Sequence, residues 1–449
     1  MLTKLHFPSL RKGALVCSIA IVLAVILVFA YLVLQERRAE DLAEDFGNPE
    51  SYLPSVTELG WSRGPSPEVH ALDVRAVALG LLVVHSGGVF VLEGATGDEA
   101  WSTDTAGRPT IEVTPDGMRV VGIEQEEDAK GGEVVVLNAV SGGREARFAT
   151  PEGADQHRHL LTSSHLLVSE VGELTAVDLD TGEAAWTYQS PSGCAPLPEF
   201  NPEEEWLWPI VTGPEHVFVA QACDSPGGRV HTVALDTATG EAVWQSQDMA
   251  LEQEVTDAYA FVRVQASEDS ETVVVCVQGK AHVLNAADGS LRGEPGAVDG
   301  EAFEDKRRLY VGAEHVVALD PDRSDEGTHA YVKYSYDGSA LEQVQIPVDV
   351  HPPVEHYWAP QRRLAVVEEG IVVLGCADEE ACGAGDSSWQ EVFFVAWGAD
   401  DPVRVEAEEL SETFSSQYMN NRLVAVPGGV VAYQEANSGR PHGAFFGLL

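Results

Sequence analysis

Short runs of apolar residues recur along most of the chain, and they come in pairs separated by turn-forming residues. LLVV and VFVL flank HSGG in residues 81–92, LLVS and LTAV flank EVGE in residues 166–177, and TVVVCV and AHVL flank QGK in residues 272–284. Apolar runs of this length between turn signals predict half-buried or buried β-strands. A helical period is nearly absent outside residues 13–34, so the pattern excludes an array of helical repeats.

A polar anchor residue ends each second run, and a short segment after it is copied along the chain. This segment reads EGATGDEAW from Glu93, DLDTGEAAW from Asp178 and DTATGEAVW from Asp236. Five anchors are followed four residues later by a glycine: Glu93, Asn138, Asp178, Asp236 and Asn285 precede Gly97, Gly142, Gly182, Gly240 and Gly289. An aromatic residue lies eight residues after three anchors, at Trp101, Trp186 and Trp244. A sixth anchor, Asp320, has Ser324 in place of the glycine, so the pattern weakens there.

The copied segment predicts a hairpin loop in which Asp or Asn caps the turn and glycine supplies a residue with positive φ. The tryptophan after the loop begins the last strand, where its flat ring can fill the wedge between neighbouring sheets. Successive anchors lie 45, 40, 58, 49 and 35 residues apart, which is room for about four strands in each unit. Units of this size predict a β-propeller, in which each small sheet buries its faces against its neighbours.

The repeat resembles the tryptophan-docking repeat of the pyrroloquinoline-quinone (PQQ)-like β-propellers, whose pattern is A-x-D-x-x-T-G-x-x-x-W. The match is strongest at Ala176–Trp186 and Ala234–Trp244, and it extends over most of residues 77–346. This superfamily includes quinoprotein dehydrogenases and the non-enzymatic scaffold lipoproteins of outer-membrane assembly. The resemblance therefore implies the fold more firmly than an activity.

Two further units follow the weakened anchor, in residues 362–397 and 422–449, and the last of them lacks an outer strand. Residues 55–62 precede the first full unit and carry Trp61, which has no partner copy. We expect these residues to supply the missing strand and close the ring. The sequence thus predicts an all-β, eight-bladed β-propeller of four-stranded antiparallel blades, with seven blades as the alternative.

One segment differs from the rest of the chain, because residues 13–34 are uncharged and mostly apolar. They are long enough to cross a membrane as one helix, and the flanking basic residues favour a cytoplasmic N-terminus. A cleaved signal peptide is the alternative. The predicted organisation is a cytoplasmic tail (1–12), a transmembrane helix (13–34), an acidic linker (35–51) and an extracytoplasmic propeller (52–449) at the plasma membrane. The net charge of −45 argues against nucleic acid and anionic lipid headgroups as partners.

Four of the six cysteines fall in segments that a propeller places on one face, between the second and third strands of a blade or between blades. We expect a disulfide between Cys194 and Cys223, and a second between Cys376 and Cys382. Cys276 lies in a strand and should be a buried apolar residue. The same face carries the longest irregular segments and four aromatic residues beside acidic runs, which make it the candidate partner face: Trp206, Trp208, Tyr357 and Trp358.

No motif in the sequence supports catalysis. The adjacent cysteines that the resemblance implies for a quinoprotein dehydrogenase are absent, and so is a G-x-S-x-G elbow. His157 with His159, and His351 with His356, lack the further ligands of a metal site. DPDRSDEG at residues 320–327 is out of register for a calcium loop. We therefore expect no catalytic residue, metal or cofactor, and a protein-binding scaffold or adaptor. A sensor of a small ligand or cation is the alternative, and a PQQ-dependent dehydrogenase comes third.

Overall fold

A computed structural model describes residues 52–63, 71–85, 87–104, 110–125, 132–151, 160–195, 197, 209–224, 228–250, 262–266, 271–277, 280–294, 309–312, 315–325, 327–347, 364–375, 391–399, 401–406, 420–435 and 444–449. The chain divides into two units, Met1–Asn48 and Pro49–Leu449. All strands described below belong to the second unit.

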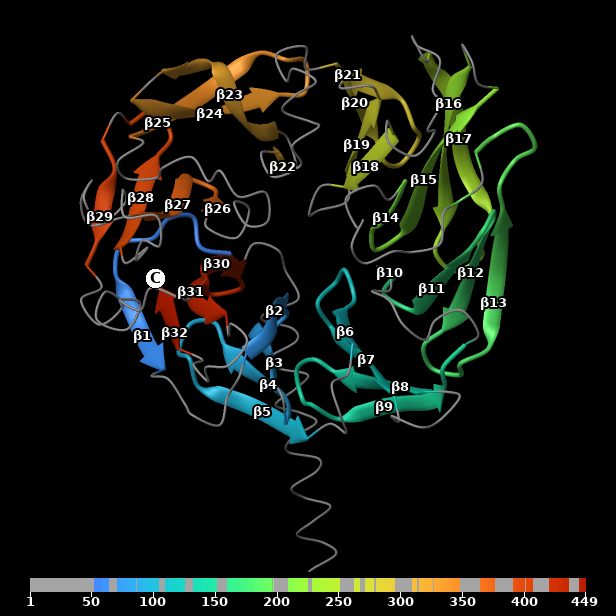
Figure 1. The fold of residues 1–449 in the computed structure, drawn as a ribbon, viewed down its shortest axis with the longest axis horizontal. Helices are drawn as coiled ribbons and strands as arrows, with labels where there is room; N and C mark the ends of the chain where they lie inside the picture. The colour runs from blue at the N-terminus through green and yellow to red at the C-terminus, as the bar shows by residue number, and fades with distance from the viewer. Residues whose placement is uncertain are drawn as a thin grey trace, which may run out of the picture. The chain divides into compact units, whose positions relative to one another are not determined.

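In the described residues, thirty-two strands form eight four-stranded antiparallel sheets, which are the blades of a propeller (Figure 1). Blade 1 holds β2 (Ala71–Val77), β3 (Gly80–His85), β4 (Gly88–Glu93) and β5 (Glu99–Asp104). Blade 2 holds β6 (Thr110–Val113), β7 (Arg119–Gln125), β8 (Gly132–Asn138) and β9 (Arg144–Ala149). Blade 3 holds β10 (Leu160–Leu161), β11 (His165–Glu170), β12 (Glu173–Asp178) and β13 (Ala184–Gln189). Blade 4 holds β14 (Ile210–Thr212), β15 (His216–Cys223), β16 (Arg229–Asp236) and β17 (Ala242–Ala250).

The remaining four blades follow in chain order around the ring. Blade 5 holds β18 (Val262–Ala266), β19 (Thr272–Val277), β20 (Lys280–Asn285) and β21 (Leu291–Gly293). Blade 6 holds β22 (Leu309–Val311), β23 (His315–Asp325), β24 (Thr328–Ser335) and β25 (Ala340–Pro347). Blade 7 holds β26 (Leu364–Val367), β27 (Gly370–Gly375), β28 (Glu391–Ala396) and β29 (Val403–Val405). Blade 8 holds β30 (Asn420–Val426), β31 (Gly429–Glu435), β32 (Phe445–Leu448) and β1 (Leu59–Arg63).

The ring is closed by the strand that comes first in the sequence. β1 pairs antiparallel with β32, so the last blade is completed from the other end of the chain. The approach to β1 is also fixed, because Val56 is buried in the core between blades 7 and 8 and the N–H groups of Thr57 and Glu58 donate to the carbonyl of Leu449. The predicted closing strand and the count of eight blades are confirmed.

The hydrophobic core is divided among the seams between adjacent blades. In β3, β19 and β27 side chains on both sides of the strand are buried, because each blade packs against a neighbour on either face. Cys276 is buried among valines and alanines of blades 5 and 6, as expected. Burial on both faces explains why the second and third strands are continuous apolar runs rather than alternating ones.

Each blade contributes loops to two opposite faces. The hairpin face carries the loops between the first and second strands and between the third and fourth, and backbone hydrogen bonds join them, for example Ala139 N–H to Met118 O at 2.8 Å. The connection face carries the loops between the second and third strands together with the segments between blades. The loops of the hairpin face and the loops of the connection face therefore lie at opposite ends of the strands.

One sequence prediction is wrong, and several lie outside the described residues. Asp320 does not begin a hairpin loop: it lies within β23, and the corresponding turn of blade 6 follows Ser335, with Gly338 at φ 86°. The spacing failed because the apolar run before Asp320 belongs to the second strand of blade 6, whereas the other five anchors each end a third strand. The predicted transmembrane segment, the Cys376–Cys382 bridge and eight side chains lie outside the described residues: Trp206, Trp208, Tyr357, Trp358, His157, His159, His351 and His356. Among the described residues, no helix is long and apolar enough to cross a membrane.

Candidate functional site

The copied hairpin loops have the geometry that their residues predict. Asp236 Oδ1 accepts hydrogen bonds from the backbone N–H groups of Ala238 and Thr239 at 3.0 and 2.8 Å, and from the Thr239 hydroxyl at 2.9 Å. The Thr239 hydroxyl and N–H hold the pKa of the Asp236 carboxyl below its usual value. Asp178 and Asn138 likewise accept the backbone N–H groups of the second and third residues after them. All five predicted glycines have positive φ, between 68° and 73°.

An aromatic ring from one blade lies on the loop glycine of the next. Trp101 covers Gly142, Trp186 covers Gly240, and Trp244 covers Gly289: a Cβ on any of these glycines would come within 2.5–2.6 Å of ring carbons. Each indole N–H also donates to a loop carbonyl of that next blade, at 2.7–2.9 Å, to Ala139, Thr237 and Ala286 respectively. Each of these tryptophans therefore contacts the hairpin loop of the neighbouring blade.

Two further docking residues were not identified from the sequence. Trp61 of β1 covers Gly97 of blade 1 and donates to Gly94 O at 2.8 Å, so the tryptophan without a partner copy docks the closing strand. Phe148 covers Gly182 between blades 2 and 3. Phe148 lies ten residues after its anchor rather than eight and is not a tryptophan, so the spacing rule could not find it.

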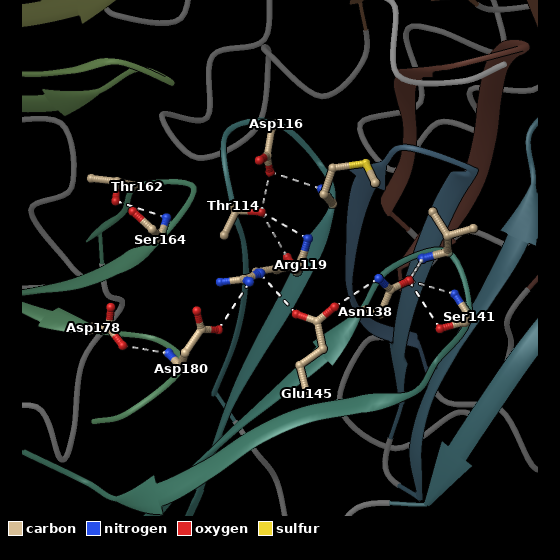
Figure 2. A network of polar contacts seen from close by, with 12 residues as sticks. Thr114, Asp116, Arg119, Asn138, Ser141, Glu145, Thr162, Ser164, Asp178 and Asp180 are labelled. Atoms are coloured by element: carbon tan, nitrogen blue, oxygen red, sulfur yellow. Dashed lines mark hydrogen bonds and ion pairs between the residues drawn. The ribbon is translucent and has the colours of Figure 1, made fainter. Parts of the chain in front are cut away.

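Between blades 2 and 3, where Phe148 offers no indole N–H, charged residues bridge the seam (Figure 2). Arg119 at the start of β7 pairs with Glu145 of β9 at 2.9 Å and with Asp180 in the loop of blade 3 at 3.1 Å. Thr114 Oγ1 accepts the Arg119 backbone N–H, and Asn138 donates to Glu145. Arg119 and its partners therefore connect blade 2 to the loop of blade 3 (Figure 2).

On the connection face, the predicted disulfide joins Cys194, in the segment between blades 3 and 4, to Cys223 at the end of β15. The two residues form an isolated antiparallel bridge, and hydrogen bonds lie on either side of it: Ala195 N–H to Ala222 O at 2.7 Å and Asp224 N–H to Gly193 O at 2.9 Å. Cys223 is buried, whereas Cys194 is half-buried. The connecting segment is thus covalently attached to the edge of blade 4.

A buried polar network beneath the disulfide holds the same segment. Gln221, only 3% exposed, donates to Ser190 Oγ at 2.9 Å and to Ala195 O at 2.7 Å, and accepts from the Tyr188 hydroxyl at 3.2 Å. Burial raises the pKa of Tyr188 to about 12, so its hydroxyl stays a donor at neutral pH. Leu197 is fully buried in the core between blades 3 and 4. We call residues 190–197 the stem, since they form a fixed base from which the chain continues toward residues 198–208.

The stem also borders the most exposed apolar side chain among the described residues. Val171, at the turn between β11 and β12, is 67% exposed. The neighbouring Gly172 donates its N–H to Leu197 O and accepts from Ser190 N–H, which ties the turn to the stem. An apolar tip on a rigid base is suited to contact with another protein.

Possible metal ligands of the described residues include a carboxylate of the calcium-like stretch at residues 320–327. No group of three His, Cys, Asp or Glu side chains in the described parts of the chain is arranged to hold a metal ion. Asp320, the first residue of the calcium-like stretch, is buried, accepts the Tyr334 hydroxyl at 2.5 Å and pairs with Arg323 at 3.2 Å. The Asp320 carboxylate, which a cation would need as a ligand, is therefore already bound to a guanidinium and a hydroxyl.

Charged residues of the innermost strands pair with one another. Arg75 of β2 contacts Asp73 at 3.0 Å and Glu112 of β6 at 3.5 Å, which links blades 1 and 2. Such pairs compensate buried charge and connect neighbouring blades. A ligand or cation site in the central channel stays a prediction from the sequence.

Comparison with known proteins identifies similar folds. The model of a PQQ-repeat family described as outer membrane protein assembly factor BamB matches residues 130–307. BamB from Moraxella catarrhalis is 13% identical, with a TM-score of 0.47, over 88% of this chain and 100% of that one. The computationally designed protein Ika8 gives the same values, and the WD40 domain of SCAP from fission yeast is 9% identical, with a TM-score of 0.47, over 89% of this chain and 98% of that one. No curated protein sequence matches the chain significantly.

Proposed function

We propose that this PQQ-like β-propeller, which resembles BamB, is a non-enzymatic, membrane-anchored scaffold that binds proteins at the cell envelope. The observation that carries the proposal is the stem, because a disulfide, a buried polar network and a buried leucine all fix one segment of the connection face. A surface loop that only joins two blades does not require this many attachments.

An extracytoplasmic location is supported by the disulfide and by the sequence. Structural disulfides form and persist mainly in oxidising compartments, and Cys194–Cys223 lies at the surface edge of a blade. The apolar residues 13–34 would export the propeller and keep it attached, with the N-terminus in the cytoplasm.

The described residues before β1 lie on the hairpin face. The carbonyl of Pro54 accepts the Glu369 N–H, and Glu369 lies in the loop between β26 and β27, on the hairpin face. Pro54 therefore lies on the hairpin face, and the stem lies on the opposite one.

The kind of partner is suggested by the family match. Residues 130–307 include blades 3 and 4 and the stem, and the matching family is named for a factor of outer membrane protein assembly. By this argument the partner is a protein of the envelope assembly machinery, and Trp206 and Trp208, in the segment that leaves the stem, would contact it.

Photo-crosslinking in cells tests this proposal. A photoreactive phenylalanine analogue replaces Val171, beside the stem, or Asp98, an exposed residue of the hairpin face, in the full-length chain. We expect a specific envelope protein to crosslink from position 171 and not from position 98, and the product to disappear when Trp206 and Trp208 are both changed to Ala. Equal crosslinking from the two faces, or a product that survives the double substitution, would refute the assignment of this face.

A further inference from the structure

Three consecutive seams of the ring lack the docking contact that joins the other blades. The fourth strand of a blade supplies the ring that covers a loop glycine of the next blade, and blades 8, 1, 2, 3 and 4 each supply one. The fourth strands of blades 5, 6 and 7 read LRG, ALEQVQIP and VRV, and they contain no aromatic residue. Other contacts must therefore hold these blades to their neighbours.

Two of the three seams are closed by other means. The core between blades 5 and 6 holds ten buried apolar residues, and Tyr334 and Tyr336 are among them. The core between blades 7 and 8 holds thirteen, including Val56 from the segment that precedes β1. That segment is tied to blade 7, because the Glu369 N–H donates to Pro54 O at 2.8 Å. At these two seams a well-filled core thus compensates for the missing ring.

The seam between blades 6 and 7 shows no such compensation in the described residues. Its core holds six buried apolar residues, and six more are only half-buried. The docked seam between blades 4 and 5 has twelve buried apolar residues and three half-buried ones. Four of the half-buried side chains between blades 6 and 7 are large aromatic ones: Tyr310, Tyr331, Phe393 and Trp397. This seam therefore combines a missing docking ring with a thinly filled core.

The polar contacts at this seam are also weaker than those of the docked seams. The indole N–H of Trp397 donates to Glu368 O of its own blade at 3.1 Å, whereas the docked indoles donate across their seams. Across this seam, Lys333 Nζ lies 5.5 Å from the centroid of the Trp397 ring. Gly398, in the turn after β28, donates its N–H to Gln343 O at 3.0 Å. A cation near the surface holds a ring less firmly than close packing on a glycine turn does.

We propose that the ring opens reversibly at the seam between blades 6 and 7 while the other seams stay closed. Opening begins where the fewest buried apolar contacts have to be broken, and the sheets of the two blades can stay intact while they separate. It exposes Ile346, Ile371 and Val395, which are fully buried in the closed ring. The stem lies between blades 3 and 4, so this conformational change is independent of the proposed partner face.

Matched pairs of buried thiols test the proposal. In β23, Val317 faces blade 7 and Val316 faces blade 5; in β27, Val373 faces blade 6 and Val372 faces blade 8. All four are at most 2% exposed, so static exposure does not distinguish them. Each is changed to Cys singly in the full-length chain, and iodoacetamide labelling of every cysteine peptide is followed by mass spectrometry. We expect Cys at 317 and 373 to react about tenfold faster than Cys at 316 and 372, and faster than the native buried Cys276.

Two labelling results would overturn the proposal. Equal rates within each pair would mean that this seam opens no more often than its neighbours. Labelling at 317 and 373 that rises with urea as steeply as global unfolding would mean that only the unfolded chain exposes these positions. Hydrogen exchange of the unmodified chain gives a measurement that needs no substitution: amides of β23 and β27 should exchange faster than those of β3 and β7, the second strands of the docked blades 1 and 2. Equally slow exchange in the four strands would also contradict opening at this seam.

Discussion

Replacement of Gly240 by Ala should destabilise the propeller far more than the same change at Gly398. Both glycines have positive φ, 69° and 75°, a conformation that costs an L-residue about 1–2 kcal/mol. Alanine also restricts the unfolded chain more than glycine does, and this offsets about 0.4–1 kcal/mol of the cost. The backbone effect is therefore similar at the two positions, a net loss of about 1 kcal/mol.

The surroundings of the two glycines differ. A Cβ at position 240 would lie 2.6 Å from Cδ2 of Trp186, whereas one at position 398 would meet nothing within 4 Å. To accommodate the methyl group, the Trp186 ring must leave the glycine and lose its hydrogen bond to Thr237 O, which contributes about 1 kcal/mol. Partial loss of packing by a ring that is only 8% exposed adds about 1–2 kcal/mol. The expected cost of Gly240→Ala is thus about 3–4 kcal/mol.

Urea denaturation at pH 7, followed by far-ultraviolet circular dichroism, measures the free energy of unfolding of both variants and of the unmodified chain. We expect Gly240→Ala to exceed Gly398→Ala by about 2–3 kcal/mol. If the two variants differ by less than about 0.5 kcal/mol, the cost comes from the backbone alone, and the docked tryptophan does not stabilise the seam.

Three other perturbations follow from the same contacts. Phe148→Trp should stabilise the chain by about 0.5–1 kcal/mol in the same urea assay, because an indole N–H could then donate to Leu179 O. This carbonyl corresponds to the acceptors in the other docked seams. A loss of stability would show that this seam has no room for the larger ring. Trp61→Ala should cost about 3 kcal/mol, since Trp61 docks the strand that closes the ring; an unchanged melting temperature would contradict the closure. Burial, with Lys333 nearby, lowers the pKa of His315 to about 4, so below pH 6.5 the unfolded state binds more protons and stability falls as the pH drops toward 4. His315→Gln should reduce this loss of stability at low pH by about 1 kcal/mol after allowance for solvent screening. An identical dependence of stability on pH in the variant would refute the role of His315.

Much of the fold could be predicted from sequence because its information is local. The apolar runs specify the two buried strands of each blade, and the anchor with its glycine specifies the hairpin, since a cap and a positive φ concern residues only two to four positions apart. Cys194 and Cys223 could be paired because the blade pattern placed both on one face. The weakened repeat was misleading in blade 6, because the apolar run that reaches Asp320 is a second strand and the hairpin turn follows Ser335 instead.

The functional surfaces were less accessible to this reasoning. The sequence placed a candidate partner face on the connection side, but it could not show that Gln221 and Tyr188 fix the stem, because a buried glutamine and an exposed one look alike in sequence.

The sequence by itself determined the architecture of this protein: a repeat of strands and glycine turns that can bury its faces only by stacking into a ring. Tertiary structure alone decided how the copies meet. Trp61 docks on Gly97 from the opposite end of the chain, and Phe148 with Arg119 replaces an indole between blades 2 and 3. The physical reason is that a turn is set by neighbouring residues, whereas contacts between blades join residues that only the closed ring brings together.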